Sequence, residues 1–371
     1  MIARLRKKQG GKQGLKKRKL FWLFTFPLVL SFIGLLFVFE ASSVRSFTEY
    51  KDSFHYFRHQ FIYIILGIGV MTFFAIFDYH KLYFLAFTFM LGTIGLLCLV
   101  LIPGIGSTGG GARSWIDFGY FNMQPTEFAK FSVIIYLASW FNYKERKRFF
   151  SFLILLGILM FLIILQPDMG TATMVFILSI MIYFLAGIDL HYLLLLVPAA
   201  AVGFWALVKI SPYRWRRIQA FFDPSVQTES VSYHINQIMI AFSNGGLFGR
   251  GFGSSRQKYL FLPEAHTDSI FAIIGEEMGF IGGVVLIGML IILLYKIYEV
   301  AMTAPDRYGR LLSGGILCYF ALQIVVNLAG MVNLFPLTGV PLPFISYGGS
   351  NLLTSFAFIG ILINIAGKSK I

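Results

Sequence analysis

A short polar stretch, KYLFLPEAHTDSIFAIIGEE at residues 258–277, contains the residue types that proton-transfer chemistry requires. Glu264, His266, Thr267 and Asp268 lie in a polar run that leads directly into an apolar segment. Carboxylates beside a hydrocarbon layer are costly to desolvate, so their presence there indicates function by default. The stretch is therefore the first candidate for an active site.

Asp268 is the predicted general base of this site. Pro263 interrupts any preceding helix and Thr267 is a suitable N-cap, so the sequence predicts Asp268 in the first turn of a helix. The helix dipole favours the ionised carboxylate at that position, where it can accept a proton at neutral pH. The structural alternative is that Asp268 only helps to cap the helix.

Glu264, His266 and Thr267 are the predicted supports of this base. His266 could orient it or carry protons, although a histidine beside a helix start more often satisfies a loop carbonyl. Glu276 and Glu277 lie a further eight and nine residues along, and we expect them to be structural or to line a groove. The chain has no HExxH, CxxC or serine–histidine pattern, so zinc hydrolysis and triad chemistry have no support.

Several cations are candidates for binding a phosphate group. The segment QPTEFAK places Glu127 and Lys130 three residues apart on one helical face. A lysine one turn inside a membrane is costly unless it is paired or hydrated. Either Glu127 neutralises Lys130, or Lys130 faces a hydrated cavity with Arg113 and binds phosphate. Further cations predicted to contact the same group are Arg214, Arg216, Arg217 and Lys258.

Polar residues in two other loops are expected to line the groove or to be structural. Asp168 lies in QPDMG, which is typical of a tight turn. Residues 333–351, NLFPLTGVPLPFISYGGSN, are too rich in proline and glycine for a regular helix and must be buried in protein or line a cavity. Ser346, Tyr347 and Ser350 could bind sugar hydroxyls there, or could satisfy the carbonyls of their own loop.

The elements that must position these residues are membrane-spanning helices. Of the 371 residues, 57% are hydrophobic and 13% charged, with a mean hydropathy of +0.75, which excludes a soluble globular protein of this length. The predicted fold is an all-α polytopic membrane protein with two long outer loops, at about 103–123 and 210–267. Ten apolar runs are long enough to span a bilayer: about 21–40, 59–77, 82–102, 124–142, 149–166, 171–187, 191–209, 268–296, 311–332 and 350–366.

The net charge of +14 sets the expected orientation. Residues 1–20 form a basic tail with nine Lys and Arg, which places the N-terminus in the cytoplasm. An even number of spans brings residues 367–371 to the same side, with residues 21–366 as one integral domain. We expect the basic tail to be disordered and held near anionic lipid. No aromatic residues interleave with its cations, so nucleic acid is not an expected partner.

Together these segments resemble the SEDS family of bacterial cell-wall glycosyltransferases, the group of FtsW, RodA and SpoVE. The matching segments run in order over about residues 20–366. The segment SSRQKYLFLPE is more similar to the FtsW and SpoVE branch than to RodA. Two departures are Ser269, where the family usually has phenylalanine, and Asn351, where a second serine is common. The matching segments are GARSWIDFG, QPTEFAK, QPDMG, FFDP, GGLFGRGFGSSRQKYLFLPEAHTDSIFAIIGEEMGFIGG and PLTGVPLPFISYGGS.

The resemblance implies a multi-pass enzyme of the bacterial cytoplasmic membrane that works on its outer side. Its substrate would be lipid II, a disaccharide-pentapeptide on undecaprenyl pyrophosphate, which it would polymerise into glycan strands. The family's essential aspartate maps to Asp268, and a penicillin-binding transpeptidase is the implied partner.

The expected reaction is an inverting transfer in which Asp268 takes the proton of the acceptor hydroxyl and outer cations stabilise the departing pyrophosphate. A requirement for a divalent cation, Mg²⁺ or Mn²⁺, is left open. A lipid II flippase and a scaffold for the transpeptidase are the alternative functions. The sequence also leaves open a role in division, elongation or sporulation.

Overall fold

The computed structural model describes residues 2–109, 112–119, 122–143, 149–188, 191–210, 215, 219 and 231–369. A helix lies at each of the ten predicted spans, and six of these helices are individually long and apolar enough to cross a membrane. The prediction of a polytopic helical membrane protein is confirmed. The ten helices are α1 (Ile2–Tyr50), α2 (His55–Ile76), α3 (Tyr79–Leu101), α4 (Pro125–Trp140), α5 (Phe149–Leu165), α6 (Met169–Leu185), α7 (His191–Ile210), α10 (Ile270–Thr303), α11 (Arg307–Met331) and α12 (Gly349–Lys368).

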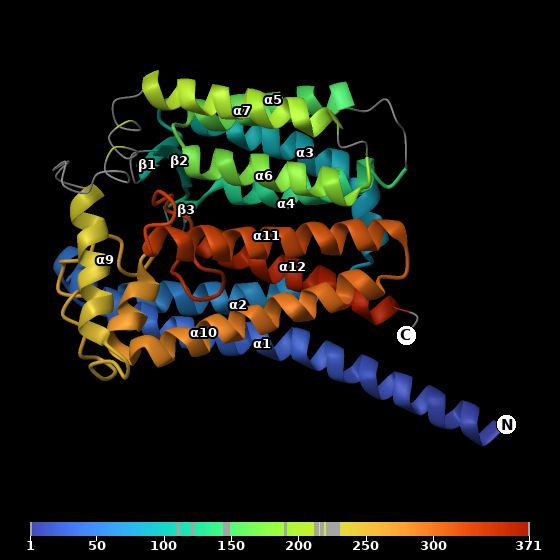
Figure 1. Cartoon of the computed structure of the whole chain (residues 1–371), viewed down its shortest axis with the longest axis horizontal. Coiled ribbons are helices and arrows are strands. Elements are labelled where there is room, and N and C mark those ends of the chain that lie inside the picture. The colour runs from blue at the N-terminus through green and yellow to red at the C-terminus, as the bar shows by residue number, and fades with distance from the viewer. Residues whose placement is uncertain are drawn as a thin grey trace.

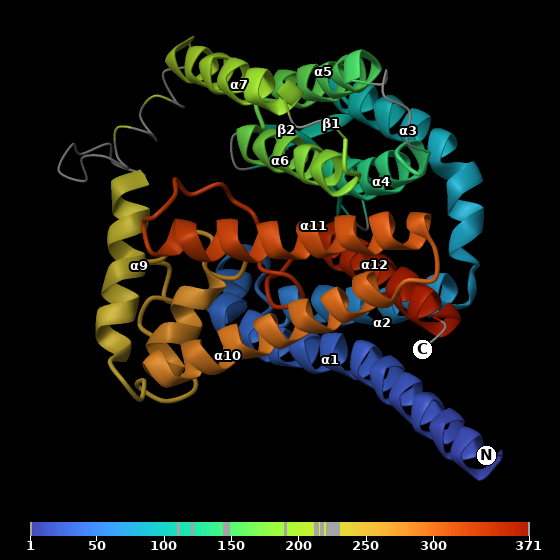
Figure 2. The ribbon, with the colours of Figure 1, turned by 45° about the vertical axis from the view of Figure 1, so that its right-hand side comes forward.

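The ten helices form two neighbouring groups (Figures 1 and 2). One group contains α3 to α7, and the other contains α1, α2, α10, α11 and α12, with α11 in contact with α4 and α6. The packing between α2 and α12 is close, because a Cβ on Gly360 would lie 2.4 Å from the Met71 carbonyl oxygen. Small residues permit such close approach of helices in a membrane, where packing drives their association.

The start of α1 and the end of α12 lie at the same end of the bundle, as the even number of spans requires (Figure 1). The predicted disordered tail is instead part of α1, which begins at Ile2. Lys19, near the end of the basic tail, contacts the last turns of α10. Its Nζ donates to the Glu299 carbonyl oxygen (2.7 Å) and to Thr303 Oγ1 (2.6 Å). Lysine is a good helix former, and a cation near carbonyls at a helix end is stabilising.

The opposite end of the bundle carries the two long loops, and both contain structure that the sequence did not predict. The first forms a small antiparallel sheet in the order β1 (Gly106–Gly109), β2 (Ala112–Asp117), β3 (Asn122–Met123). The second contains α9 (Val231–Gly245), which crosses the ends of the spans in Figure 1. Ile235, Ile238 and Ala241 are its buried apolar residues and pack it onto the bundle.

Helix α10 is broken at Gly279, whose φ of 68° and ψ of −169° are not helical. Residues 246–251 fill this break. Position 249 requires glycine, because a Cβ there would lie 2.1 Å from the Glu277 carbonyl oxygen. Four backbone hydrogen bonds join the two segments: Phe280 N to Gly246 O (2.9 Å), Ile281 N to Leu247 O (3.2 Å), Arg250 N to Glu276 O (3.1 Å) and Gly251 N to Glu277 O (3.0 Å).

The break gives α10 two parts with different surroundings. Residues 270–277 are all buried, whereas residues 280–303 expose one side. The second part alone is about 36 Å long at 1.5 Å per residue, which is enough to cross a bilayer. The first part is therefore a short helix held inside the protein, and it leads back from the break to Asp268.

Candidate active site

Asp268 lies just before α10 and not in its first turn. The helix begins at Ile270 with Ser269 at the N-cap, so the predicted cap at Thr267 was wrong. The physical reason is that Thr267 Oγ1 donates to Glu264, with distances of 3.1 Å to its carbonyl oxygen and 3.0 Å to its Oε2. The amide of Ser269 also donates to the Glu264 carbonyl oxygen (3.2 Å), which closes a compact turn ahead of the helix.

Three separate elements hold the partly exposed Asp268 in place. Within its own turn, Thr267 Oγ1 lies 3.3 Å from Asp268 Oδ1. From α11, Asn327 donates from Nδ2 to the backbone carbonyl of Asp268 (2.9 Å) and to that of Val340 (2.7 Å). The loop after α11 also approaches, since a Cβ built on Gly339 would lie 4.0 Å from Asp268 Oδ2.

The other short segments singled out in the sequence meet near this loop. In QPDMG, Gly170 lies against the loop, with a built Cβ 2.5 Å from the Thr338 carbonyl oxygen. Asp168 caps α6 there, accepting from the amide (3.0 Å) and Oγ1 (2.7 Å) of Thr171. Ser350 Oγ accepts from the amide of Gln124 at the start of QPTEFAK (3.0 Å). The loop after α11 thus links QPDMG to Asp268, since Thr338 contacts Gly170 and its neighbour Gly339 approaches Asp268.

His266 is buried with its ring beside two tyrosine rings. The ring centroids lie 4.5 Å from that of Tyr56 and 5.5 Å from that of Tyr347. The backbone of Tyr347 also donates to the His266 carbonyl oxygen (2.9 Å). Burial, with a contribution from the nearby Arg45 cation, lowers the pKa of His266 to about 4. The imidazole is therefore neutral near pH 7, and its contacts are those of a packing group.

The end of α1 and the start of α2 reach this site, which the sequence did not indicate. Glu49 accepts from Arg45 Nε (2.8 Å) and from the Tyr56 hydroxyl (2.7 Å). Arg45 also lies 3.7 Å from Glu264 Oε1 in a half-exposed ion pair. These contacts connect two distant helices to the turn that carries Asp268.

Glu276 and Glu277 lie at the far end of the buried part of α10 and are almost fully inaccessible, at 0% and 1% exposure. Glu276 Oε2 accepts from Ser255 Oγ (2.5 Å) and from the Gln257 amide (3.3 Å). Its Oε1 accepts from Asn244 Nδ2 (3.3 Å). The structure therefore places Glu276 as an anchor for the preceding loop, as the sequence indicated.

Lys258 is buried and its ammonium is already paired. Its Nζ lies 2.7 Å from Glu40 Oε2 of α1 and 3.9 Å from Glu277 Oε1, and it donates to the Gly253 carbonyl oxygen (2.6 Å). A phosphate could reach this cation only if the pair with Glu40 opened.

The other two predicted phosphate ligands within the described residues also have structural partners. Arg113 donates to the carbonyl oxygens of Ile102 (2.8 Å) and Gly106 (3.1 Å), which braces the β-hairpin on α3. Lys130 is buried 2.5 Å from Glu127 Oε1, so the neutralised pair is the observed alternative. Arg214, Arg216 and Arg217 lie outside the described residues.

The Lys130–Glu127 pair belongs to a larger buried cluster. Asn351 donates from Nδ2 to Glu127 Oε2 (3.2 Å) and lies 3.2 Å from the Tyr319 hydroxyl. The Tyr319 ring centroid is 5.6 Å from the Lys130 ammonium, which permits a cation–π contact. Asn351, one of the two departures from the family pattern, is thus a hydrogen-bond donor to the buried Glu127 carboxylate.

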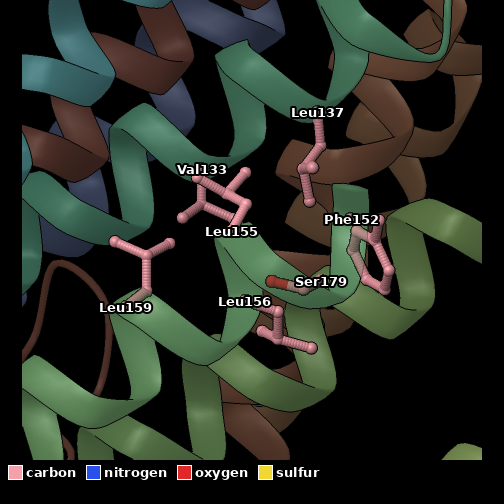
Figure 3. Close-up of a pocket in the computed structure, with 7 residues that line it drawn as sticks. All are labelled: Val133, Leu137, Phe152, Leu155, Leu156, Leu159 and Ser179. Atoms are coloured by element: carbon pink, nitrogen blue, oxygen red, sulfur yellow. The ribbon is translucent and has the colours of Figure 1, made fainter. Parts of the chain in front are cut away.

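Ser346, another predicted groove residue, is bonded to its own loop and to α2. Ser346 Oγ accepts from the Leu342 amide (2.8 Å), and its carbonyl oxygen accepts from Gln60 Nε2 (3.2 Å). Across the described part of the chain, no three His, Cys, Asp or Glu side chains converge to hold a metal ion. The small cavity of Figure 3 is lined by apolar side chains of α4 and α5 with Ser179 of α6, and offers no reactive group.

Comparison with known proteins fits this arrangement. The sequence profile of the FtsW/RodA/SpoVE family, described as "Cell cycle protein", matches residues 19–371. The chain belongs to this family. It is 38% identical over 349 residues to the probable peptidoglycan glycosyltransferase FtsW of Geobacter sp. (strain M18), covering 92% of this chain and 95% of that protein.

A second relative and a solved structure match over similar lengths of the chain. The stage V sporulation protein E of Bacillus subtilis (strain 168) is 38% identical over 356 residues, covering 94% of this chain and 97% of that protein. A solved structure titled "Structural coordination of polymerization and crosslinking by a peptidoglycan synthase complex" contains a chain that matches with a TM-score of 0.77. That match is 25% identical and covers 94% of this chain and 97% of the other.

Proposed function

We propose that this protein is a peptidoglycan glycosyltransferase that polymerises lipid II at the outer face of the bacterial cytoplasmic membrane, with Asp268 as the general base. The observation that carries the proposal is the setting of Asp268. Asp268 is a partly exposed residue, and three elements fix its backbone and surroundings. A positioned and accessible carboxylate is what base catalysis requires.

In the proposed step, Asp268 accepts the proton of the acceptor sugar 4-hydroxyl as that oxygen attacks the anomeric carbon of the donor. The new glycosidic bond forms as the bond to pyrophosphate breaks, with inversion at the anomeric carbon. The bonding electrons leave with the undecaprenyl pyrophosphate, and the proton stays on Asp268 until it passes to water. Glu264 and Thr267 support the base through the turn that they close.

The departing pyrophosphate requires positive charge. We assign that role first to Arg214, Arg216 and Arg217, because Arg113, Lys130 and Lys258 are engaged with partners of their own. A divalent cation, Mg²⁺ or Mn²⁺, would have to bind chiefly to the pyrophosphate oxygens, with Asp268 or Glu264 as the protein ligands at this site. Bound there, it would supply charge stabilisation of the leaving group.

A transpeptidase of the penicillin-binding class is the proposed partner. A glycan strand made at the outer face becomes mechanically useful only when its peptides are cross-linked. The structural match to a chain of a complex that coordinates polymerisation and cross-linking supports this pairing. A scaffolding role for the transpeptidase would add to the enzymatic activity and would not replace it.

A lipid II flippase is the competing function, and the position of the polar groups argues against it. A flippase needs polar residues along the whole path, whereas the buried polar cluster lies near the outer helix ends. Glu127 and Lys130 lie within the first six residues of α4, and Asn351 is the third residue of α12. Asn327 is likewise four residues from the outer end of α11.

The test is a polymerisation assay with purified protein and lipid II, run with and without a divalent cation and with and without the transpeptidase. We expect wild-type protein to make glycan polymer and Asp268→Ala to make none, while the variant inserts into membranes and binds lipid II normally. Polymer at wild-type levels from Asp268→Ala would refute the assignment of the base. Lipid II flipping by both proteins, with polymer from neither, would favour transport.

A further inference from the structure

Residues 246–261, here called the outer segment, have the reverse of the polarity expected for a loop in water. Six of their large apolar side chains are exposed, with Phe248 at 80%. A water-facing loop normally exposes polar groups, and a contiguous apolar surface usually marks a contact with a membrane or a partner. The six residues are Leu247, Phe248, Phe252, Tyr259, Leu260 and Phe261.

Three polar side chains of the outer segment point inward, whereas Arg250, Ser254 and Arg256 are exposed. Ser255, Gln257 and Lys258 are buried, and they or their backbone amides contact the carboxylates of Glu276, Glu277 and Glu40. This arrangement gives Ser255 and Lys258 polar partners inside the protein and leaves the large apolar side chains outside. It is the arrangement that a lipid environment selects, because lipid offers no hydrogen bonds.

The outer segment is also continuous with surfaces of the spanning helices. The exposed Phe252 ring packs with its edge on the buried ring of Phe37 of α1, with 5.6 Å between the ring centroids. Gly246 and Leu247 are hydrogen-bonded to Phe280 and Ile281 at the start of the spanning part of α10. Both of those α10 side chains are exposed, so one apolar surface runs from the spanning helix onto the segment.

We infer that the outer segment is a membrane anchor whose apolar side chains insert into the outer leaflet of the bilayer. Backbone groups of Gly246, Leu247, Arg250 and Gly251 are bonded to the break in α10, which helps an irregular segment to lie at the boundary between headgroups and acyl chains. Arg250 and Arg256 are exposed in the same segment, at a position suited to lipid phosphates.

The anchor has a structural consequence for Asp268. The outer segment is tied to Glu276 and Glu277, which end the buried part of α10, and Asp268 lies just ahead of the other end of that part. A segment fixed at the leaflet boundary therefore sets the depth of Asp268 relative to the membrane surface. This consequence, unlike the lipid contact itself, rests on the proposed function.

The experiment measures depth by spin labelling of the full-length protein in phosphatidylethanolamine–phosphatidylglycerol vesicles. Cys98 and Cys318 are the only cysteines, so a Cys98→Ser/Cys318→Ala background allows single labels. Labels are placed by Phe248→Cys and, as a second position, Tyr259→Cys. Exposed controls are Leu91→Cys on α3, which faces lipid, and Thr108→Cys in the other outer loop.

For each label we compare its accessibility to two reagents. Oxygen concentrates in lipid, whereas a nickel chelate stays in water. We expect both outer-segment labels to favour oxygen, as Leu91→Cys does, while Thr108→Cys favours the chelate. Preference for the chelate at both positions would overturn the inference. Low accessibility to both reagents would also overturn it, because a second copy of the chain or another protein would then cover the surface. Neither outcome depends on glycosyltransferase activity.

Discussion

Asp268 and Glu276 lie eight residues apart in one segment, at the two ends of the buried part of α10, and differ in almost every physical respect. Glu276 is inaccessible, and both of its oxygens accept hydrogen bonds from the preceding loop. Asp268 is partly exposed, and the bond from α11 goes to its backbone carbonyl, not to its carboxylate.

The difference shows how one helix can separate structural from reactive acids. Carboxylate oxygens engaged by buried donors hold a loop in place, because removing them leaves those donors unsatisfied. A partly exposed carboxylate, whose turn is held through its backbone, stays within reach of a substrate. If this comparison is correct, equivalent substitutions at the two ends should affect different measurable quantities.

The largest expected effect is on the rate of the Asp268→Asn variant. This substitution preserves shape and removes the base, so polymerisation should fall by about 10²–10⁴-fold, the usual contribution of a general base. Thermal stability should change little, because the Asn327 contact is made by the backbone carbonyl and the asparagine oxygen can still accept from Thr267. Initial rates of glycan synthesis and thermal denaturation in detergent provide the two measurements.

Glu276→Gln is the matched control, since it makes the same chemical change at the structural end. Stability should fall by about 1.5–3 kcal/mol, the value of hydrogen bonds to a buried charge. The rate per folded molecule should change much less than in Asp268→Asn. The comparison fails if Glu276→Gln loses activity at full stability or if Asp268→Asn unfolds.

The next effect concerns the ion pair that fastens the outer segment to α1. Lys258→Met leaves Glu40 and Glu277 without their shared cation, so we expect a loss of about 3–5 kcal/mol, typical of a broken buried pair. Adding Glu40→Gln should recover part of that loss. A double-mutant cycle by thermal denaturation measures the coupling, and additive losses would show that the pair contributes nothing.

A pH dependence should follow from burial of His266. Its folded-state pKa of about 4 lies below the ordinary histidine pKa of 6.5, so the unfolded chain binds the proton more tightly. Stability is therefore fully present above about pH 6.5 and is lost as pH falls toward 4, by no more than about 3 kcal/mol. Thermal denaturation of wild type and His266→Phe across this range is the test, and an identical slope in the variant would exclude His266 as the source.

The sequence located much of this site because its signals are local. The sequence predicted a helix start at Asp268 from Pro263, the small polar residues and the apolar run that follows. The observed start, Ile270, is two residues later. The cap itself was misplaced, because the Thr267 hydroxyl bonds to Glu264, an alternative that composition does not reveal. Burial of Glu276 followed from its apolar neighbours.

Long-range pairs could not be inferred in the same way. Nothing local indicates that Lys258 pairs with Glu40, more than 200 residues earlier, or that Tyr56 stacks on His266. The break in α10 was also missed, because its glycine acts only together with the loop that fills it. Such contacts depend on how the helices pack, and a single sequence carries little record of that.

The smallest expected effect concerns Tyr56, which we assign as a positioning residue for the turn that carries Asp268. Tyr56→Ala removes the ring that packs on His266 and the hydroxyl that donates to Glu49, and should lower kcat by less than tenfold with KM unchanged. Tyr56→Phe keeps the ring and loses one partly exposed hydrogen bond, which costs about 0.5–1.5 kcal/mol of stability at most.

Because the ring is the group that contacts His266, Tyr56→Phe should restore most of the kcat lost in Tyr56→Ala. If the phenylalanine variant were as slow as the alanine variant, the hydroxyl and its bond to Glu49 would be the positioning contact. If KM rose instead of kcat falling, Tyr56 would act on substrate binding. In the remaining case, unchanged kinetics in both variants, Asp268 would be positioned by Asn327 and its own turn alone, and the contribution of α1 and α2 would be limited to stability.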